Sequence, residues 1–324
     1  MRVLLIGLGR WGEKHLRVLG ELGCELWVAD RSPERRAFAV KAGVPEARAV
    51  ADFRAALPHV DVVDLVTPAD SHLSLASECL RAGKDCFVEK PLTLTVAEGR
   101  ALAGVVRSTK RVLQVGHIFR FHPVTQLMRE RIRSGTAGAV RYCTGRFAGF
   151  KRPRTDVGVT QTDGIHYFDL FAYLLEENPT AVTATLRDFL GRGMDDVGFC
   201  SVEYDRVPAF VEVGYFAPGT YRDCVIVGEE ETLAGDFGTA EVKVLANRHV
   251  KHGEVWNAPD GAGETLKASG PEPLRQELTL FLDACARRTA PPVDVEAGLL
   301  ALKVVEAAQR SSELGRRVLL SELG

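Results

Sequence analysis

The chain lacks the features that define several large classes of protein. No apolar run among its 324 residues approaches the roughly 18 residues that a membrane-spanning helix needs. The formal net charge is only −2 and the pI is near 6.5, so neither nucleic acid nor a membrane surface is an expected partner. The seven cysteines are odd in number and form no Cys-x-x-Cys pair, which indicates reduced thiols in a cytoplasmic protein.

The composition of the chain is that of an ordinary globular protein. Hydrophobic residues make up 46% and charged residues 26% of the sequence, and the length suffices for two domains. No internal repeat or low-complexity tract is visible. We therefore expect two packed domains joined without a long linker.

Short aliphatic runs alternate with helical patterns through the first third of the chain. Strands are expected at 3–6, 26–29, 62–66, 86–88 and 111–115, with helices between them that include 71–82 and 95–107. Ser32-Pro33 has the pattern of an N-cap followed by the first residue of a helix. This alternation predicts a parallel sheet with right-handed crossovers.

A glycine-rich motif links the first strand to the first helix. Gly7 allows a tight turn, Gly9 lets the backbone approach a pyrophosphate, and Gly12 allows close packing of helix on strand. Asp30 ends the second strand, 18 residues beyond Gly12, where a carboxylate can accept hydrogen bonds from the adenosine ribose. The motif predicts a dinucleotide site that prefers NAD, although Arg31 could bind the 2′-phosphate of NADP.

Beyond residue 119 the alternation of strand and helix stops. Strands are expected at 141–150, 181–187, 198–204, 209–215 and 223–228, and helices at 166–175, 271–288 and 297–314. The predicted fold class is an α/β Rossmann domain, residues 1–119, followed by an α+β domain, residues 120–324, with a largely antiparallel open sheet. The helix near 297–314 is expected to pack back on the first domain.

Glu89-Lys90-Pro91 follows the strand expected at 86–88. A lysine in a partly dry site can lower its pKa and exchange protons near neutrality, and the adjacent Glu89 can orient Lys90. The alternative is an exposed ion pair before a turn proline.

The densest polar cluster of the second domain opens the helix expected at 166–175. On a helix Asp163, His166 and Asp169 share roughly one side, with Tyr173 continuing it. An Asp–His pair can orient an imidazole and tune its proton affinity. The alternative is an N-cap aspartate beside a histidine satisfied between domains. With a single histidine in view and no second ligand motif, no metal site is expected.

Two further groups of basic side chains are candidates for anion binding. His117 and Arg120 follow the last strand of the first domain, where ligands gather at the carboxyl ends of an open sheet. Arg120 could clamp a phosphate or carboxylate, or form an interdomain salt bridge. Lys151, Arg152 and Arg154 form a loop that could grip a diphosphate or simply be solvated.

Together these motifs resemble the glucose–fructose oxidoreductase/inositol dehydrogenase (Gfo/Idh/MocA) family over nearly the whole chain. The matching segments, in order, are Gly7-x-Gly9-x-x-Gly12, Thr67-Pro68-x-x-x-His72, Ala82-Gly83-Lys84, Glu89-Lys90-Pro91, Gly116-His117-x-x-Arg120-Phe121-x-Pro123, Gly164-x-His166-x-x-Asp169, Phe281-Leu282-Asp283-Ala284 and Ser311…Gly315-Arg316. The resemblance implies NAD(P)-dependent hydride transfer on a hydroxyl group of a sugar, cyclitol or nucleotide sugar. The stretch 115–121 is similar to the sugar-nucleotide 3-dehydrogenases of this family.

The resemblance also implies roles for individual residues. Lys90 would carry the proton and His166 would be the catalytic histidine, with Asp163 beside it. The family usually has Asp or Asn four residues before the histidine, where this chain has Thr162; one residue corresponds to about 100° on a helix. The expected cofactor-binding residues are Gly7, Gly9, Arg10, Trp11, Gly12, Asp30, Arg31, Thr67, Pro68, His72 and Glu89, and the expected substrate-binding residues are His117, Arg120, Thr162 and Asp169.

Three interpretations of the whole protein follow. The first is an NAD(P)-dependent oxidoreductase that acts on CH–OH groups and forms a homodimer or homotetramer through the uncovered sheet face. In the second, the same site oxidises a sugar transiently and is redox-neutral overall. In the third, the protein is a non-catalytic NAD(P)-sensing regulator, because a fold does not determine a function.

Overall fold

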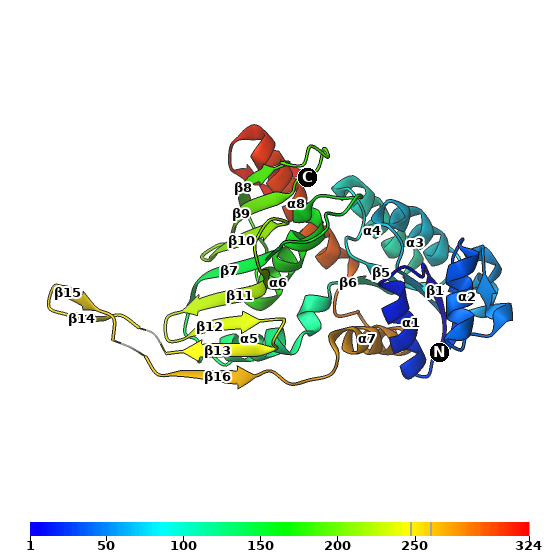
Figure 1. Ribbon diagram of the computed structural model, residues 1–324, viewed down its shortest axis with the longest axis horizontal. Helices are drawn as coiled ribbons and strands as arrows, with labels where there is room; N and C mark the ends of the chain where they lie inside the picture. The colour runs from blue at the N-terminus through cyan, green and yellow to red at the C-terminus, as the bar shows by residue number, and fades with distance from the viewer. Residues whose placement is uncertain (247, 260, 324) are drawn as a thin grey trace. The chain divides into compact units, whose positions relative to one another are not determined.

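Two compact units make up the computed structural model, which describes residues 1–246, 248–259 and 261–323 (Figure 1). The first unit contains Met1–Ile118 together with Glu272–Leu302, and the second contains Phe119–Pro271 and the chain from Lys303 onward. The first boundary lies one residue before the expected one. Residues 272–302, which we expected in the second domain, group with the first.

The first unit is built on a six-stranded sheet in which every neighbouring pair is parallel. The strands are β1 (Arg2–Ile6), β2 (Glu25–Ala29), β3 (Ala49–Val50), β4 (Val62–Leu65), β5 (Asp85–Glu89) and β6 (Leu113–Gly116), and their order is β3-β2-β1-β4-β5-β6. This is the strand order of the doubly wound dinucleotide-binding fold, whose direction of winding reverses between β1 and β4. The predicted Rossmann domain is confirmed.

Helices connect these strands, and their ends follow local capping chemistry. They are α1 (Gly12–Glu21), α2 (Pro33–Lys41), α3 (His72–Arg81) and α4 (Val96–Thr109). Ser32 caps α2 by accepting a hydrogen bond from the Arg35 amide at 3.3 Å. Thr95 and Glu98 form a capping box on α4. The helix expected at 71–82 begins at His72, because Ala69–Ser71 forms a 3-10 turn.

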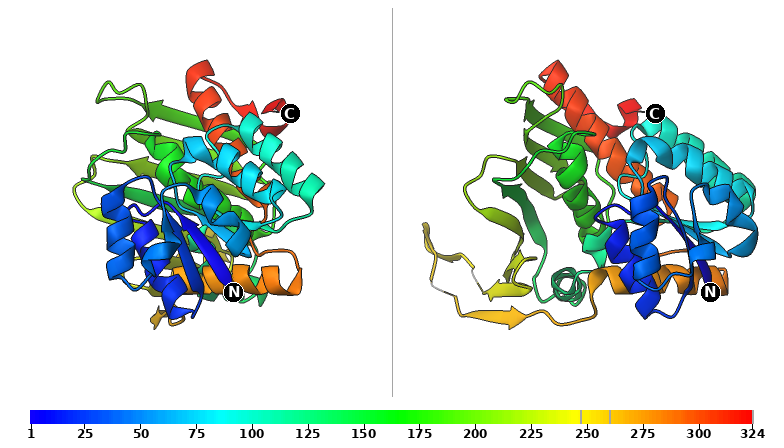
Figure 2. Two further views of the ribbon diagram at one scale, coloured as in Figure 1. Left: turned by 90° about the vertical axis from the view of Figure 1, so that its right-hand side faces the viewer. Right: turned by 45° about the vertical axis from the view of Figure 1, so that its right-hand side comes forward.

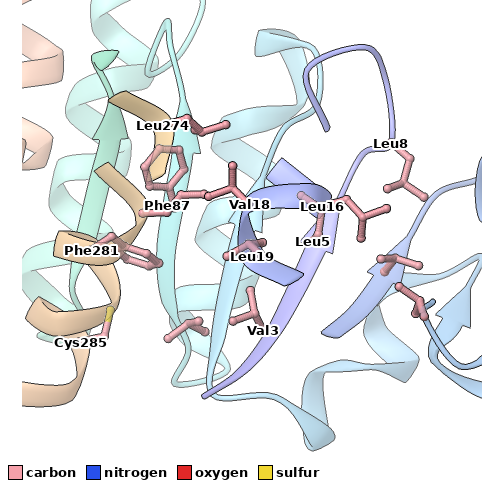
Figure 3. Packing of buried hydrophobic residues seen from close by; sticks show 14 of the residues in the cluster. Val3, Leu5, Leu8, Leu16, Val18, Leu19, Phe87, Leu274, Phe281 and Cys285 are labelled. Atoms are coloured by element: carbon pink, nitrogen blue, oxygen red, sulfur yellow. The ribbon is translucent and has the colours of Figure 1, made fainter. Parts of the chain in front are cut away.

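Helix α7 (Pro273–Arg287) explains why a late segment belongs to the first unit. Its apolar stripe is buried in the same hydrophobic cluster as β1, β5 and α1. Phe281 packs edge-on against Phe87 of β5, with ring centroids 5.6 Å apart. Figure 3 shows Phe281 and Leu274 of α7 beside Phe87 of β5 and Val18 of α1. Helix α8 (Val295–Leu314) begins in this unit, where Leu299 lies against Gly99 of α4.

The second unit contains a nine-stranded sheet. Its strands are β7 (Val140–Gly149), β8 (Ala181–Arg187), β9 (Val197–Glu203), β10 (Pro208–Gly214), β11 (Thr220–Gly228), β12 (Thr232–Asp236), β13 (Glu241–Leu245), β16 (Gly263–Lys267) and β17 (Val318–Leu319), in the order β16-β13-β12-β11-β7-β10-β9-β8-β17. Only β7 and β10 pair in parallel, so the prediction of a largely antiparallel sheet is confirmed. The hairpin of β14 (Val250–His252) and β15 (Val255–Asn257) extends beyond β13 and β16 (Figure 1).

One face of this sheet is covered by helices α5 (Pro123–Arg133) and α6 (Ile165–Leu175) (Figure 2). The Tyr167 ring lies so close to Gly145 of β7 that a Cβ there would come within 2.4 Å of the ring. The Tyr167 hydroxyl lies 2.7 Å from the Arg146 carbonyl oxygen and 2.9 Å from that of Asp223. This packing fixes α6, which carries His166, against the central strands.

All seven cysteines are free thiols, and Cys24 alone is not fully buried. Over the residues that the structure describes, no helix combines the length and apolarity needed to cross a bilayer.

Candidate cofactor and catalytic sites

The glycine-rich loop connects β1 to α1 with almost no spare volume. Gly7 has φ of +96°, and a Cβ there would lie 2.5 Å from the Val66 carbonyl oxygen. A Cβ on Gly12 would lie 2.1 Å from the Gly7 carbonyl oxygen. At Gly9, by contrast, a Cβ would meet no atom within 4 Å. Close packing therefore requires glycine at positions 7 and 12, and position 9 is open to a ligand.

The start of α1 is suited to an anion. Trp11 occupies the N-cap, and its side chain makes no capping hydrogen bond to the helix. The first-turn amides and the positive end of the helix dipole are the groups that bind a diphosphate in such a loop. Arg10, which precedes Trp11, is exposed.

Asp30 is held rigidly at the carboxyl end of β2. Its Oδ2 accepts a hydrogen bond from the Leu8 amide at 2.8 Å, and its Oδ1 accepts one from the Ser32 amide at 2.9 Å. Each carboxylate oxygen has a second lone pair, so Asp30 can still accept hydrogen bonds from ribose hydroxyls. Arg31 is exposed beside it. These residues fit an NAD molecule.

Thr67, Pro68 and His72 lie together after β4. The Thr67 hydroxyl is 2.7 Å from that of Ser71. The buried His72 ring lies 2.9 Å from the Thr67 carbonyl oxygen and 3.0 Å from that of Pro91. Burial lowers the pKa of His72, and the ring links the loop after β4 to the segment after β5. His72 therefore shapes this region through the backbone of its neighbours.

Glu89 ends β5 inside a buried polar cluster. Its Oε1 accepts hydrogen bonds from the Trp11 indole nitrogen at 2.7 Å and from His15 Nε2 at 3.2 Å. His15 Nδ1 lies 2.8 Å from Asp64 Oδ2 on β4. The indole nitrogen of Trp11 is therefore engaged by Glu89.

Lys90 follows Glu89 directly. The Lys90 amide donates to Glu89 Oε2 at 3.1 Å, and the Lys90–Pro91 peptide bond is cis. The side chain is partly exposed, whereas Glu89 is buried. Lys90 therefore leaves the carboxyl end of β5 beside a fixed carboxylate.

His166 of α6 lies in a stack of aromatic rings. Its ring centroid is 4.6 Å from that of Phe119 and 5.9 Å from that of Phe147, with interplanar angles of 17° and 11°. Phe237 stacks on Phe119 at 4.6 Å. The stack fixes the plane of the imidazole.

The segment before His166 is a π-helical turn, Thr160–Gly164. Such a turn adds one residue to the helical phase, so spacing counted on a regular α-helix does not hold here. Thr162 and Asp163 are both buried in it. Asp163 Oδ2 accepts a hydrogen bond from Lys151 Nζ at 2.6 Å, and Lys151 Nζ lies 4.3 Å from the Phe147 ring centroid. Asp163 is thus paired with a lysine that lies over the stack holding His166.

Arg120 and Asp169, both predicted to bind substrate, bind each other. Arg120 Nε lies 2.8 Å from Asp169 Oδ2, and Nη2 lies 2.6 Å from Oδ1. The guanidinium also stacks on Tyr173 at 5.0 Å. This bidentate pair lies within the second unit, so it is not the interdomain salt bridge that we considered. His117 belongs to the first unit and is buried.

The basic loop is largely neutralised by aspartates. Arg154 makes a bidentate pair with Asp156 at 2.7 and 2.5 Å, and Lys151 pairs with Asp163. Arg152 is exposed. Because two of its three cations are paired with aspartates, this loop is a weak candidate for binding a diphosphate.

Sequence comparison identifies the class to which this fold and its glycine-rich loop belong. Residues 1–117 match the oxidoreductase family with an NAD-binding Rossmann fold, GFO_IDH_MocA, and residues 125–234 match the GFO/IDH/MocA C-terminal domain. The protein is an NAD-binding oxidoreductase. It belongs to the Gfo/Idh/MocA family, as its motifs predicted.

Individual relatives are similar over most of the chain. A UDP-N-acetylglucosamine 3-dehydrogenase from Acidithiobacillus ferrooxidans is 35% identical over 88% of this chain and 89% of its own. An inositol 2-dehydrogenase from Rhizobium meliloti is 33% identical over 65% of each chain. A solved structure of the Acidithiobacillus enzyme superposes with a TM-score of 0.85 at 25% identity, covering 97% of this chain and 98% of that one.

Sequence reasoning did not single out His15, Asp64 or Phe119. One signal was available: Asp64 interrupts an apolar strand, where an unpaired carboxylate would be costly. Its partner could not be inferred, because His15 lies 49 residues earlier on another element.

We predict that Asp30→Ala weakens NADH binding about 10–100-fold, the loss expected for one or two hydrogen bonds to a charged acceptor. Titration of the protein with NADH, followed by fluorescence, measures it. NADPH binding should change less, and exposed Asp52→Ala is the control. Equal affinity of wild type and Asp30→Ala for NADH would contradict the assignment.

Proposed function

We propose that the protein is an NAD(P)-dependent dehydrogenase of a hydroxyl group on a sugar, cyclitol or nucleotide sugar. The observation that carries the proposal is Lys90, which follows a fixed carboxylate at the carboxyl end of β5 in a complete dinucleotide-binding unit. Ligands of such sheets bind at the carboxyl ends of the strands. A lysine beside the bound dinucleotide can exchange the hydroxyl proton.

The proposed roles divide between hydride and proton. When bound, the nicotinamide supplies the hydride acceptor or donor. Lys90 takes the proton of the reacting hydroxyl, or returns it in the reverse direction, and Glu89 orients Lys90. His166, held in its aromatic stack, hydrogen-bonds the reacting hydroxyl or its neighbour. The Lys151–Asp163 pair supports the view that Asp163 acts through Lys151.

A nucleotide sugar is the substrate that we favour within this class. The support is the relative named UDP-N-acetylglucosamine 3-dehydrogenase, which matches this chain over 88% of its length. The inositol 2-dehydrogenase matches over 65%. The free cysteine thiols fit a protein of the cytoplasm.

The proposal is tested with NAD or NADP and a panel of polyols, aldoses and UDP-sugars, by following the absorbance of the reduced cofactor. We expect reduction with at least one member, and the largest rate with a UDP-sugar. Turnover of a sugar with no accumulation of NADH would instead favour the redox-neutral enzyme. Tight NAD binding with no turnover of any compound would favour the regulatory protein.

Lys90→Ala should lower kcat by about 10²–10⁴-fold, the usual contribution of general acid–base catalysis. The affinity for NADH should stay within about threefold of wild type, less than the roughly tenfold that a lost charged hydrogen bond costs. Steady-state kinetics and NADH titration measure the two effects. Lys41→Ala, on the surface of α2, is the matched control. An unchanged kcat would contradict the role of Lys90.

We further propose that copies of the protein associate through the sheet face of the second unit that α5 and α6 do not cover. Phe199, Phe210 and Tyr142 on it are 53%, 46% and 40% exposed. Arg146, Glu212 and Asp223 line the hollow between these strands, and Arg146 is paired with Asp223 at 3.0 Å, so the aromatic side chains carry the proposal. Exposed aromatic patches of this kind mark interfaces.

The double variant Phe199→Asp/Phe210→Asp should convert a dimer or tetramer to monomer, because it places charges in an apolar contact. Light scattering coupled to gel filtration measures the mass. Phe38→Asp, in the first unit, should leave the mass unchanged. A wild-type monomer at micromolar concentration would contradict the proposal.

A further inference from the structure

His15 is a buried titratable residue to which the proposed reaction gives no role. Its side chain has no exposed surface and lies on α1 between two carboxylates. Nδ1 is 2.8 Å from Asp64 Oδ2, and Nε2 is 3.2 Å from Glu89 Oε1. The rings of Trp11 and Phe87 contact it edge-on, at 5.9 and 5.7 Å.

The geometry limits the protonation states that this cluster can adopt. A neutral imidazole has one N–H, whereas both ring nitrogens of His15 face carboxylate oxygens. Two ionised carboxylates with no cation between them would be very costly to bury. The contacts are satisfied by an imidazolium that donates to Asp64 and Glu89 at once, whereas a neutral ring would need one of the two carboxyl groups to be protonated.

The proton affinities agree with an imidazolium at His15. Burial alone would lower the pKa of His15, but the charges and hydrogen bonds of Asp64 and Glu89 raise it to about 10. Burial tends to raise the pKa of Glu89, yet the hydrogen bond and charge of His15 keep it below its ordinary value. Burial raises the pKa of Asp64, and His15 opposes that rise.

The Glu89 carboxylate has no freedom to move. Oε1 accepts from His15 and Trp11, and Oε2 accepts from the Lys90 amide. A Cβ on Gly116 of β6 would lie 2.8 Å from Oε1, so glycine is needed behind it. The other ionisable groups near the cluster are His72, close to Glu89, whose pKa is lowered by burial, and the half-buried Cys24 thiol close to Asp64. Lys14 lies over the Trp11 ring at 4.6 Å.

The imidazolium offsets one of the two carboxylate charges. Asp64 and Glu89 carry −2 and His15 returns +1, which leaves −1 in the cluster beside Lys90. We propose that His15 is a positioning residue: clamped between Asp64 and Glu89, it fixes the Glu89 carboxylate and limits the negative charge that faces Lys90 to one. Without it, the two carboxylates would have no cation between them, and any second negative charge that they kept would hold the Lys90 proton more tightly. The inference rests on the proposed function only where it assigns the Lys90 proton a part in the reaction.

The test follows the titration of Lys90 in the cofactor-free protein, labelled with ¹³C at the lysine Cε. The Lys90 signal is assigned by its loss in Lys90→Arg. Where both carboxylates stay ionised, His15→Gln should raise the Lys90 midpoint by about 1 pH unit, the order of effect of one extra charge at an effective dielectric constant near 20. His15→Gln/Asp64→Asn restores the net charge of −1 and should return the midpoint to that of wild type. His59→Gln, on the surface of the same unit, is the control.

An unchanged midpoint in His15→Gln, with the carboxyl ¹³C shifts showing Asp64 and Glu89 both ionised, would overturn the proposal. If His15→Gln does not fold, the double variant alone tests the proposal. A Lys90 midpoint far from that of wild type in the double variant would contradict a net charge of −1 in the cluster. With a substrate in hand, the acid limb of kcat/KM should shift upward with the Lys90 midpoint, whereas a merely structural role would lower stability without moving it. Because the NMR titration uses neither substrate nor cofactor, an inactive protein would refute the proposed function and leave this test intact.

Discussion

A buried cluster of three ionisable side chains determines how the end of β5 is built. Two carboxylates from neighbouring strands, Asp64 and Glu89, are held by one imidazole from α1, and each group is almost fully buried. A buried charge is stable only when it is paired and hydrogen-bonded, so no member of the set can be removed alone without a large penalty. The same helix begins at the glycine-rich loop, so α1 has its N-terminus at that loop and carries His15 to the end of β5 about one turn later.

In the second unit, the candidate catalytic side chain, His166, is held by a different kind of interaction. His166 is fixed by stacked rings, and the ion pairs Arg120–Asp169 and Lys151–Asp163 lie to either side in sequence. Thr162 and Asp163 both lie in the π-helical turn before His166. Four residues before the histidine, where the resemblance leads one to expect Asp or Asn, this chain has Thr162, and the next residue, Asp163, is paired with Lys151.

Local patterns predicted the fold and the dinucleotide loop well, because both depend on residues close in sequence. Ser32-Pro33, Thr95 and the glycines each act within a few residues. Strands β12, β13 and β16 were missed, since their pairing is set by partners far along the chain. The His15 cluster, the ion pair of Arg120 with Asp169 and the packing of α7 in the first unit were missed for the same reason. Each of these contacts joins residues 49 or more positions apart.

The most direct test of this account is the protonation state of His15. A long-range ¹H–¹⁵N correlation spectrum of the cofactor-free protein near pH 8, with the signal assigned by its loss in His15→Gln, resolves the two ring nitrogens. The account predicts that both are protonated, as in an imidazolium, at a pH where an ordinary histidine is neutral. A spectrum with one protonated and one bare nitrogen would contradict it, because a neutral ring cannot donate to both carboxylates.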